Sequence, residues 1–105
     1  MSYNGWKNYE TWNVKLWIDN DQGSHETWQS RGEQLIRDET EEDRTGEEIR
    51  DAASDKLADE LKDWHEENRP DVSGTYSDLL NAALGEVDWK EIAENIVSEM
   101  DIDRE

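Results

Sequence analysis

The chain has 105 residues, which suits one domain and leaves little room for a second. It contains no cysteine, so disulfides, cysteine-ligated zinc and thiol chemistry are excluded. Asp and Glu number 29 against 11 Lys and Arg, and the formal net charge of −18 disfavours direct contact with nucleic acid or an anionic membrane surface.

The charge and the aromatic residues are unevenly distributed along the chain. Residues 1–20 carry no net charge and contain five of the nine aromatic residues, whereas the whole −18 falls in residues 21–105. Leu, Ile and Val are few and Phe is absent, so the six Trp must supply much of a thin core. The sequence therefore predicts a neutral aromatic segment joined to an acidic remainder.

The first predicted helix covers residues 9–20. Asn8 precedes it and is a good N-cap, because its side chain can accept a hydrogen bond from the first turn. An alternating pattern over residues 12–18 leaves a strand as the less favoured alternative. The apolar face of the helix is expected on three residues at helical spacing, Tyr9, Trp12 and Leu16.

A second helix is predicted over residues 24–38, with Gly32 weakening its middle. Its apolar side is expected on Trp28, Leu35 and Ile36. Residues 38–44 are mostly acidic, and we expect them to form a solvated connector.

The third predicted helix has the clearest signals. Thr45 and Glu48 have the spacing of a capping box, and the helix should end before Pro70 because the residue preceding a proline avoids helical geometry. Apolar residues follow at helical spacing and predict its core face: Ile49, Ala53, Leu57, Leu61 and Trp64.

Two further helices complete the predicted fold. The fourth covers residues 75–84, with Gly85 expected to end it. The fifth starts at Asp88, where Asp88 and Glu91 predict another capping box and Val87 with Ile92 predicts a hydrophobic staple. The expected apolar faces are Tyr76, Leu79, Leu80 and Ala83 in the fourth helix, and Trp89, Ile92, Ala93, Ile96, Val97 and Met100 in the fifth.

These elements predict an all-α fold, a compact bundle of about four to five short helices in one acidic domain over residues 1–105. Residues 101–105 should fray. No apolar run has the length of a membrane span, and no basic start followed by an apolar run suggests a secretory signal. We therefore expect a cytoplasmic protein.

Recognisable catalytic and metal-binding patterns are missing. His25 and His65 belong to neither a His-Glu-x-x-His nor a Glu-x-x-His pair, and the glycines are too scattered for a phosphate loop. Residues 19–23 open like a calcium loop, but its glycine and its final glutamate are misplaced. The sequence thus predicts a protein that is not an enzyme and uses no cofactor or metal.

One acidic pattern recurs every four residues along the third helix, a step of about 6 Å, roughly opposite the apolar row. Its members are Glu47, Asp51, Asp55, Asp59, Asp63 and Glu67. The row can be interpreted as an imitation of nucleic-acid phosphates or as the solvated face of a salt-adapted protein. For the row taken alone, the solvated face is the favoured interpretation, since screening relieves its repulsion.

The aromatic segment also has two interpretations. Trp6, Trp12 and Trp17 either cap the thin core, which is favoured, or expose a patch for a partner or a second copy. A homodimer through Trp6 or Trp17 is the minority alternative. Thr11 and Asn13 have no structural role that the sequence reveals, so they join Trp6 and Trp17 as candidate binding residues.

Residues 4–20 resemble the opening of a family of small uncharacterised proteins associated with phages, plasmids and some salt-loving microbes. The resemblance rests on an Asn-Gly-Trp-x-Asn-Tyr-Glu-Thr-Trp motif at residues 4–12 and covers about a sixth of the chain. It implies a context of mobile elements, and it carries no catalytic residue over to this chain. Host-interaction or anti-defence roles are what that context would favour.

For the whole chain, the leading hypothesis is a non-enzymatic interaction domain that acts as an acidic decoy or inhibitor of a basic nucleic-acid-binding protein. The carboxylates expected to bind are Asp51, Asp55, Asp59 and Asp63. The alternative is a salt-adapted structural or accessory domain of a halophile or mobile element, in which acidity serves only solubility.

Overall fold

The protein, as a computed structural model, is described over residues 2–40, 43–98 and 100. These residues form five helices: α1 (Tyr9–Asn20), α2 (Gln22–Glu39), α3 (Gly46–Glu67), α4 (Thr75–Glu86) and α5 (Trp89–Ser98). The predicted all-α fold is confirmed, and the strand alternative over residues 12–18 is wrong. The predicted fraying of residues 101–105 lies outside the described residues.

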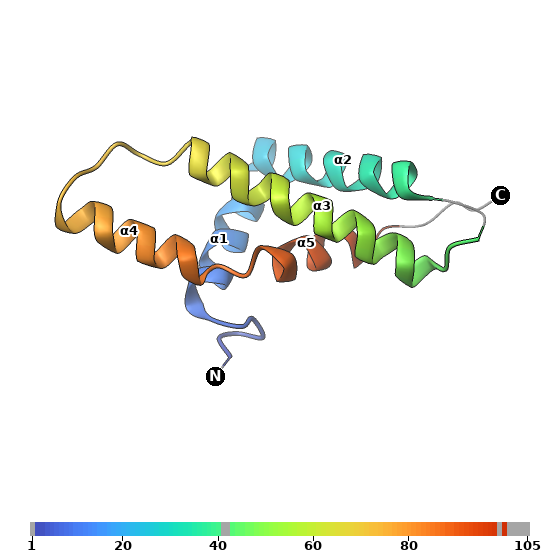
Figure 1. The fold of residues 1–105 in the computed structure, drawn as a ribbon, viewed down its shortest axis with the longest axis horizontal. Helices are drawn as coiled ribbons and strands as arrows, with labels where there is room; N and C mark the ends of the chain where they lie inside the picture. Colours follow the sequence, from blue (N-terminus) through green and yellow to red (C-terminus); the bar gives the residue numbers. More distant parts are fainter. Residues whose placement is uncertain (1, 41–42, 99, 101–105) are drawn as a thin grey trace.

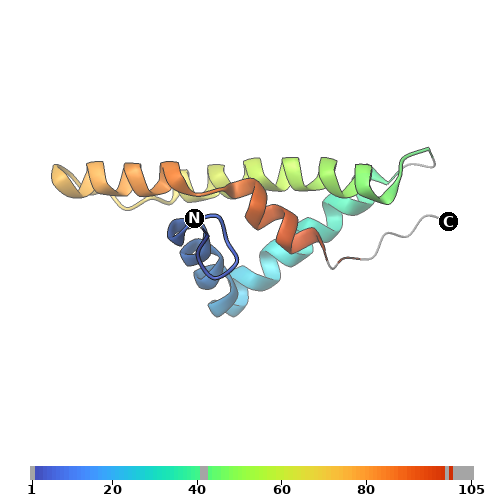
Figure 2. The ribbon, with the colours of Figure 1, turned by 90° about the horizontal axis from the view of Figure 1, so that it is seen from below.

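Helices α2 and α3 run antiparallel, and α5 packs against both of them (Figure 1). In the view turned by 90°, α2 and α3 converge at one end of the molecule and diverge at the other, where α1 lies between them (Figure 2). Helix α4 projects past the C-terminal end of α3 and contacts only α1 among the other helices. This projection explains a radius of gyration of 15.1 Å, against about 13 Å for a compact domain of this length.

The core lies where α2, α3 and α5 meet. As predicted, Ile49, Ala53, Leu57 and Leu61 of α3 are buried, and so is the whole predicted face of α5. Gly32 allows α2 to approach α5 closely, since a Cβ there would lie 2.8 Å from Cε of Met100 and 3.3 Å from Cγ2 of Ile96. The glycine predicted to weaken α2 is thus a packing residue.

Local capping sets most of the helix boundaries. Asn8 caps α1, and Thr45 with Glu48 forms the predicted capping box of α3. Helix α2 begins at Gln22, two residues before the predicted start, because the Asp21 carboxylate accepts a hydrogen bond from the Ser24 amide at 3.1 Å. These contacts satisfy amides that the first turn of a helix leaves without partners.

Two predictions at the ends of α4 and α5 are wrong in detail. Gly85 does not end α4, because it lies inside the last turn without a positive φ, and Val87 caps the helix instead. Asp88 accepts the Glu91 amide at 3.0 Å as expected, but the Glu91 carboxylate accepts the backbone amide of Lys7 at 3.0 Å. The second half of that capping box is therefore replaced by a tie to the N-terminal segment.

The predicted inner face of α1 is also wrong. The buried residues are Thr11, Lys15 and Ile18, whereas Tyr9 and Leu16 are exposed. Tyr3, Tyr9 and Trp12 pack against one another outside the core, with ring centroids 5.0–5.5 Å apart. The helix is rotated because these rings bury part of their surface on each other, and the Lys15 ammonium binds Asp19 at 2.6 Å.

Three large apolar side chains predicted to be buried are exposed instead. Trp64, in the last turn of α3, keeps 48% of its surface exposed. No residue of α4 is buried, and Tyr76 and Leu79 remain 73% and 61% exposed. The physical reason in α4 is that no helix in the described chain covers the face on which its first turns present Tyr76 and Leu79.

Candidate functional site

Two adjoining hollows lie where α4 leaves the bundle, and together we call them the aromatic groove. One, of about 600 Å³, lies between α1, the start of α2 and the end of α3, and is lined by residues that include Trp17, Trp28, Trp64 and His65. The other, of about 290 Å³, lies between α1 and α4 and is lined by residues that include Tyr9, Leu80, Ala83 and Leu84. Asn13 and Val14 line both hollows, so the two adjoin each other along one face of α1.

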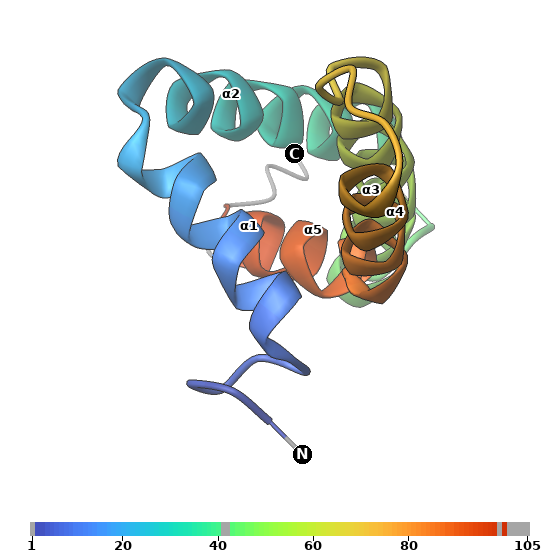
Figure 3. The same ribbon diagram turned by 90° about the vertical axis from the view of Figure 1, so that its left-hand side faces the viewer.

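The groove opens because α1 and α4 meet at only one end. The Asn8 side-chain amide donates to the Glu86 carbonyl at 2.7 Å, which joins the start of α1 to the end of α4. Figure 3 views the molecule from this end, and α1, α2 and α4 lie on three different sides of it. The helices that form the walls of the groove are therefore fixed at one corner and separate from there.

An aromatic stack forms one end of the groove. Trp28 and Trp64 meet edge to face at 6.3 Å, and His65 lies between Trp64 and Trp89 at 4.8 and 5.0 Å. His65 Nδ1 lies 2.7 Å from the Leu61 carbonyl, which can only accept, so this nitrogen carries the proton. Burial lowers the pKa of His65 and outweighs that bond, so the imidazole is neutral near pH 7.

The charge around the groove is negative. Its lining includes Glu10 and Asp21, and among its described lining residues there is no Lys or Arg. Asp63 and Asp78 stand exposed beside Trp64 and Leu79 in the sequence. An occupant of this groove would therefore meet apolar walls and an acidic edge.

The four candidate residues of the aromatic segment fall in different environments. Trp17 is 67% exposed and lines the groove together with the half-buried Asn13. Trp6 ends the turn at residues 3–6 and is partly buried against the core. The prediction that Thr11 belongs to a binding surface is wrong, because Thr11 has no exposed surface.

Thr11 has the structural role that the sequence did not reveal. Its hydroxyl donates to Asn8 Oδ1 at 2.6 Å and accepts from the Asp88 amide at 2.9 Å. The same Asn8 oxygen accepts the Thr11 amide. The caps of α1 and α5 are thereby joined through one buried hydroxyl.

All six carboxylates of the α3 row are exposed, as the periodicity predicted. The row divides into two parts, because Lys90 of α5 binds Asp51 at 2.9 Å and also binds Asp55. Although partial burial opposes it, these bonds raise the pKa of Lys90 and keep the ammonium charged. Asp59 and Asp63 have no cation beside them among the ion pairs of the described chain.

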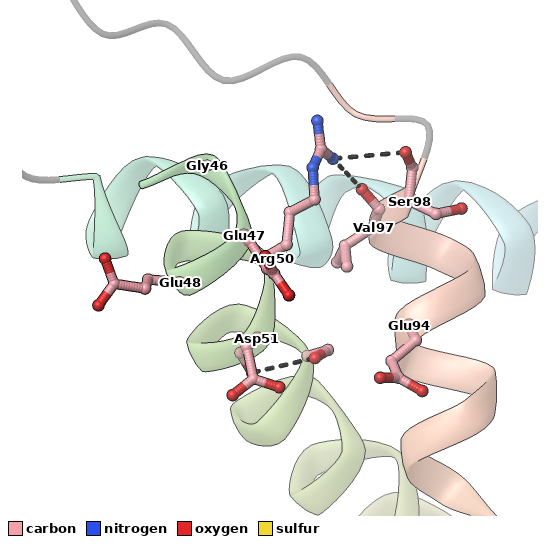
Figure 4. Close-up of a pocket in the computed structure, with 9 residues that line it drawn as sticks. Gly46, Glu47, Glu48, Arg50, Asp51, Glu94, Val97 and Ser98 are labelled. Atoms are coloured by element: carbon pink, nitrogen blue, oxygen red, sulfur yellow. Dashed lines mark hydrogen bonds between the residues drawn. The ribbon is translucent and has the colours of Figure 1, made fainter. Parts of the chain in front are cut away.

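The start of the row borders an acidic hollow of about 650 Å³ between α3 and α5 (Figure 4). Glu47, Asp51 and Glu94 contribute carboxylates, while Arg50 donates to the Val97 carbonyl at 2.6 Å at the end of α5. In the parts of the chain that are described, no three Asp, Glu or His side chains are grouped so as to hold a metal. The hollow thus adds negative charge to the surface.

Sequence reasoning missed the groove and the turn that precedes α1. Tyr3 and Trp6 exchange backbone hydrogen bonds at 2.7 and 2.8 Å around Asn4 and Gly5, both with positive φ. An Asn-Gly pair is the strongest short signal for such a turn, so it could have been found. The groove depends on which apolar faces stay uncovered, and no local pattern reports that.

None of the described helices combines the length and apolar character needed to cross a membrane. No curated protein and no solved structure matches the chain. A family model described as a family of unknown function, DUF7249, matches residues 1–103. Because that match spans nearly the whole chain, the protein belongs to this family of unknown function.

Proposed function

We propose that this is a non-enzymatic interaction domain that binds a basic protein through the α3 carboxylate row. The observation that carries the proposal is that all six carboxylates of the row are exposed along a single helix. From Glu47 to Glu67 the row extends over about 30 Å. A basic nucleic-acid-binding protein is the partner class that such a surface would suit, because its own cleft is built to accept a row of anions.

The stiffness of α3 supports this proposal. Its opposite face is buried against α2 and α5, and Arg31 of α2 holds Glu60 with two hydrogen bonds of 2.6 and 2.7 Å. A carboxylate row on a fixed helix needs no ordering when it binds, so less conformational entropy is lost. Asp59 and Asp63, which no cation in the described chain neutralises, are expected to contribute most.

The use of the basic residues also supports it. Glu39 accepts hydrogen bonds from Lys56 and Arg44. Both bonds lower the pKa of Glu39, and the bond from Lys56 has the larger effect. Arg50 and Lys90 are engaged with α5 and α3 respectively. These cations bind groups within the protein, and the net charge of −18 makes the field outside it negative, which would attract a basic partner at long range.

The context implied by residues 4–20 would suit an inhibitor. A protein of a mobile element that fills the cleft of a host DNA-binding protein would need to compete with DNA and to catalyse nothing. Competition with DNA is therefore part of the proposal.

A charge-matched pair of variants tests the role of the row. The row variant changes Asp51, Asp55, Asp59 and Asp63 to Asn. The control variant changes four exposed acids elsewhere, Glu26, Glu33, Asp38 and Asp43, to the corresponding amides. Affinity capture from lysate at physiological salt should yield a partner that duplex DNA displaces, and the row variant alone should lose it.

Capture that is equal for the wild-type protein and the row variant would show that α3 is not the binding surface. If both variants lost capture equally, net charge rather than the row would account for binding. That second outcome would favour the alternative function, a salt-adapted accessory domain. Exposed carboxylates on all five helices are the specific observation that supports this alternative.

A further inference from the structure

We propose that the aromatic groove is the docking site of a basic amphipathic α-helix from a partner protein. The site goes beyond the α3 row, because the residues that line its hollows are not members of the row, although Asp63 borders both surfaces, and because it uses apolar contact rather than charge alone. Its occupant would place apolar side chains in the two hollows and basic side chains along the acidic edge.

Large apolar side chains are left uncovered on α1 and α4. Trp17, Tyr76 and Leu79 are the three most exposed large apolar side chains of the described protein, and Trp17 lines the groove. In a chain with so few Leu, Ile and Val, large apolar groups would be expected to serve the core first. Exposed apolar groups with a polar edge mark interaction surfaces. Tyr76 and Leu79 line neither hollow and lie farther out along α4.

Helix α4 supplies an apolar wall beside α1. Leu80, Ala83 and Leu84 face α1 and line the smaller hollow. Tyr76 lies four residues before Leu80, and Leu79 four before Ala83, so both continue the same face outward along the helix. The apolar wall therefore runs past the point where α1 leaves α4 and has no covering helix in the described chain.

The shape of the site favours a helix as the occupant. Two hollows that adjoin across Val14 would receive side chains spaced along one face, as in helix-in-groove recognition. Helices α1 and α4 already form two walls that separate from a fixed corner, and a third helix would complete their packing. An extended strand would find no sheet edge here in the described fold.

Charge complementarity decides between a foreign helix and a second copy of this chain. The edge carries Glu10 and Asp21, and the only titratable base in the lining, His65, is neutral near pH 7. A second copy would bring the same acidic edge and a net charge of −18, so the two copies would repel. A helix with Lys or Arg on its polar face would be attracted instead.

Two synthetic peptides of identical composition test the proposal with the full-length protein. The first places Leu and Lys so that Leu forms one helical face, and the second scrambles the order so that no face forms. Fluorescence anisotropy of the labelled peptides at physiological salt should give an affinity for the first at least about 10-fold higher than for the second. Equal affinities would overturn the groove proposal.

Variants locate the binding site. Tyr76→Gln with Leu79→Gln, and separately Trp17→Gln, should reduce the affinity for the amphipathic peptide to that for the scrambled one. All three side chains are exposed, so folding should be retained, and circular dichroism checks this. Leu16→Gln is the matched control, since Leu16 is an exposed apolar residue of α1 that lines neither hollow, and it should leave affinity unchanged.

Failure of this proposal is distinguishable from failure of the α3 proposal. If the α3 row variant bound neither peptide and the groove variants bound both as the wild-type protein does, the groove proposal would be overturned. The α3 row would then be the binding surface. Sedimentation analysis of the free protein completes the test. A dimer abolished by Tyr76→Gln with Leu79→Gln would make a second copy the occupant and overturn the foreign-helix proposal, whereas a monomer supports it.

Discussion

Thr11 links the first helix to the last through a buried hydroxyl, so its replacement should be costly. Thr11→Val keeps the size of the side chain but leaves the Asp88 amide without its acceptor. We expect a loss of about 1–3 kcal/mol in the free energy of unfolding, the cost of an unsatisfied buried amide. Urea unfolding measures it, and Thr11→Ser, which retains the hydroxyl, should lose less than Thr11→Val. A valine variant as stable as the wild-type protein would contradict this role.

His65 should make the protein less stable in mild acid. Burial lowers its pKa from the ordinary value of 6.5, so the unfolded chain takes up a proton at a pH where the folded one does not. The contribution of neutral His65 to the free energy of unfolding is complete above pH 6.5. It is lost as the pH falls from 6.5 through the lower pKa of His65 in the folded state. Urea unfolding in high salt, which screens the carboxylates, should show that the free energy of unfolding declines as the pH falls, and His65→Gln should remove this decline. If the free energy of unfolding depended on pH in the same way in both proteins, the role of His65 would be contradicted.

At the scale of the element, α4 should be the least stable helix. It has no buried residue, it contacts α1 alone among the helices, and Gly74 gives its N-terminus no side-chain cap. Hydrogen exchange should therefore be fastest in the amides of α4, slowest in those of α3 and α5, and slowed in α4 by bound amphipathic peptide. Exchange of α4 at the rate of α3 would show that the helix is held by contacts other than those described.

The sequence predicted helices whose signals are local. Helix α3 has a capping box at its start, a long apolar row along its buried face and a proline beyond its end, and the observed helix agrees with each signal. The core face of α5 was predicted correctly because its apolar residues follow one helical period without interruption. For such helices, the spacing of the apolar residues alone predicts which face is buried.

The candidate site was only partly predictable, because burial depends on which helix lies opposite. In α1, Tyr9 and Leu16 have the spacing of a core face, yet Thr11 and Lys15 are buried once Asp88 and Asp19 supply partners for their polar groups. Tyr76 and Leu79 have the spacing of a core face too, and no helix of the described chain covers them. Periodicity identifies an apolar face but not its neighbour.

For the whole molecule, repulsion among carboxylates should make stability depend on salt. Adjacent members of the α3 row are four residues apart, and each such like-charge pair costs a few tenths of a kcal/mol at low salt, or about 1 kcal/mol in sum. We expect the free energy of unfolding to rise between low salt and about 1 M KCl, where the Debye length shrinks to about 3 Å. Urea unfolding at both salt concentrations provides the measurement.

A pair of substitutions in the same row gives the control. Asp59→Asn with Asp63→Asn removes two charges that form no ion pair in the described part of the chain, so the variant should be more stable than the wild-type protein at low salt and respond less to KCl. A wild-type transition unchanged by KCl would show that the negative charge is spaced widely enough to cost nothing.

The stack of Trp28, Trp64, His65 and Trp89 gives the molecule an intrinsic optical reporter. It runs from the buried Trp89 to the half-exposed Trp64 at the edge of the aromatic groove. A protonated imidazole quenches an adjacent indole, whereas an apolar ligand shifts indole emission to the blue. Acidification and ligand binding would therefore be read as separate spectral changes, one in intensity and one in wavelength, without any added dye.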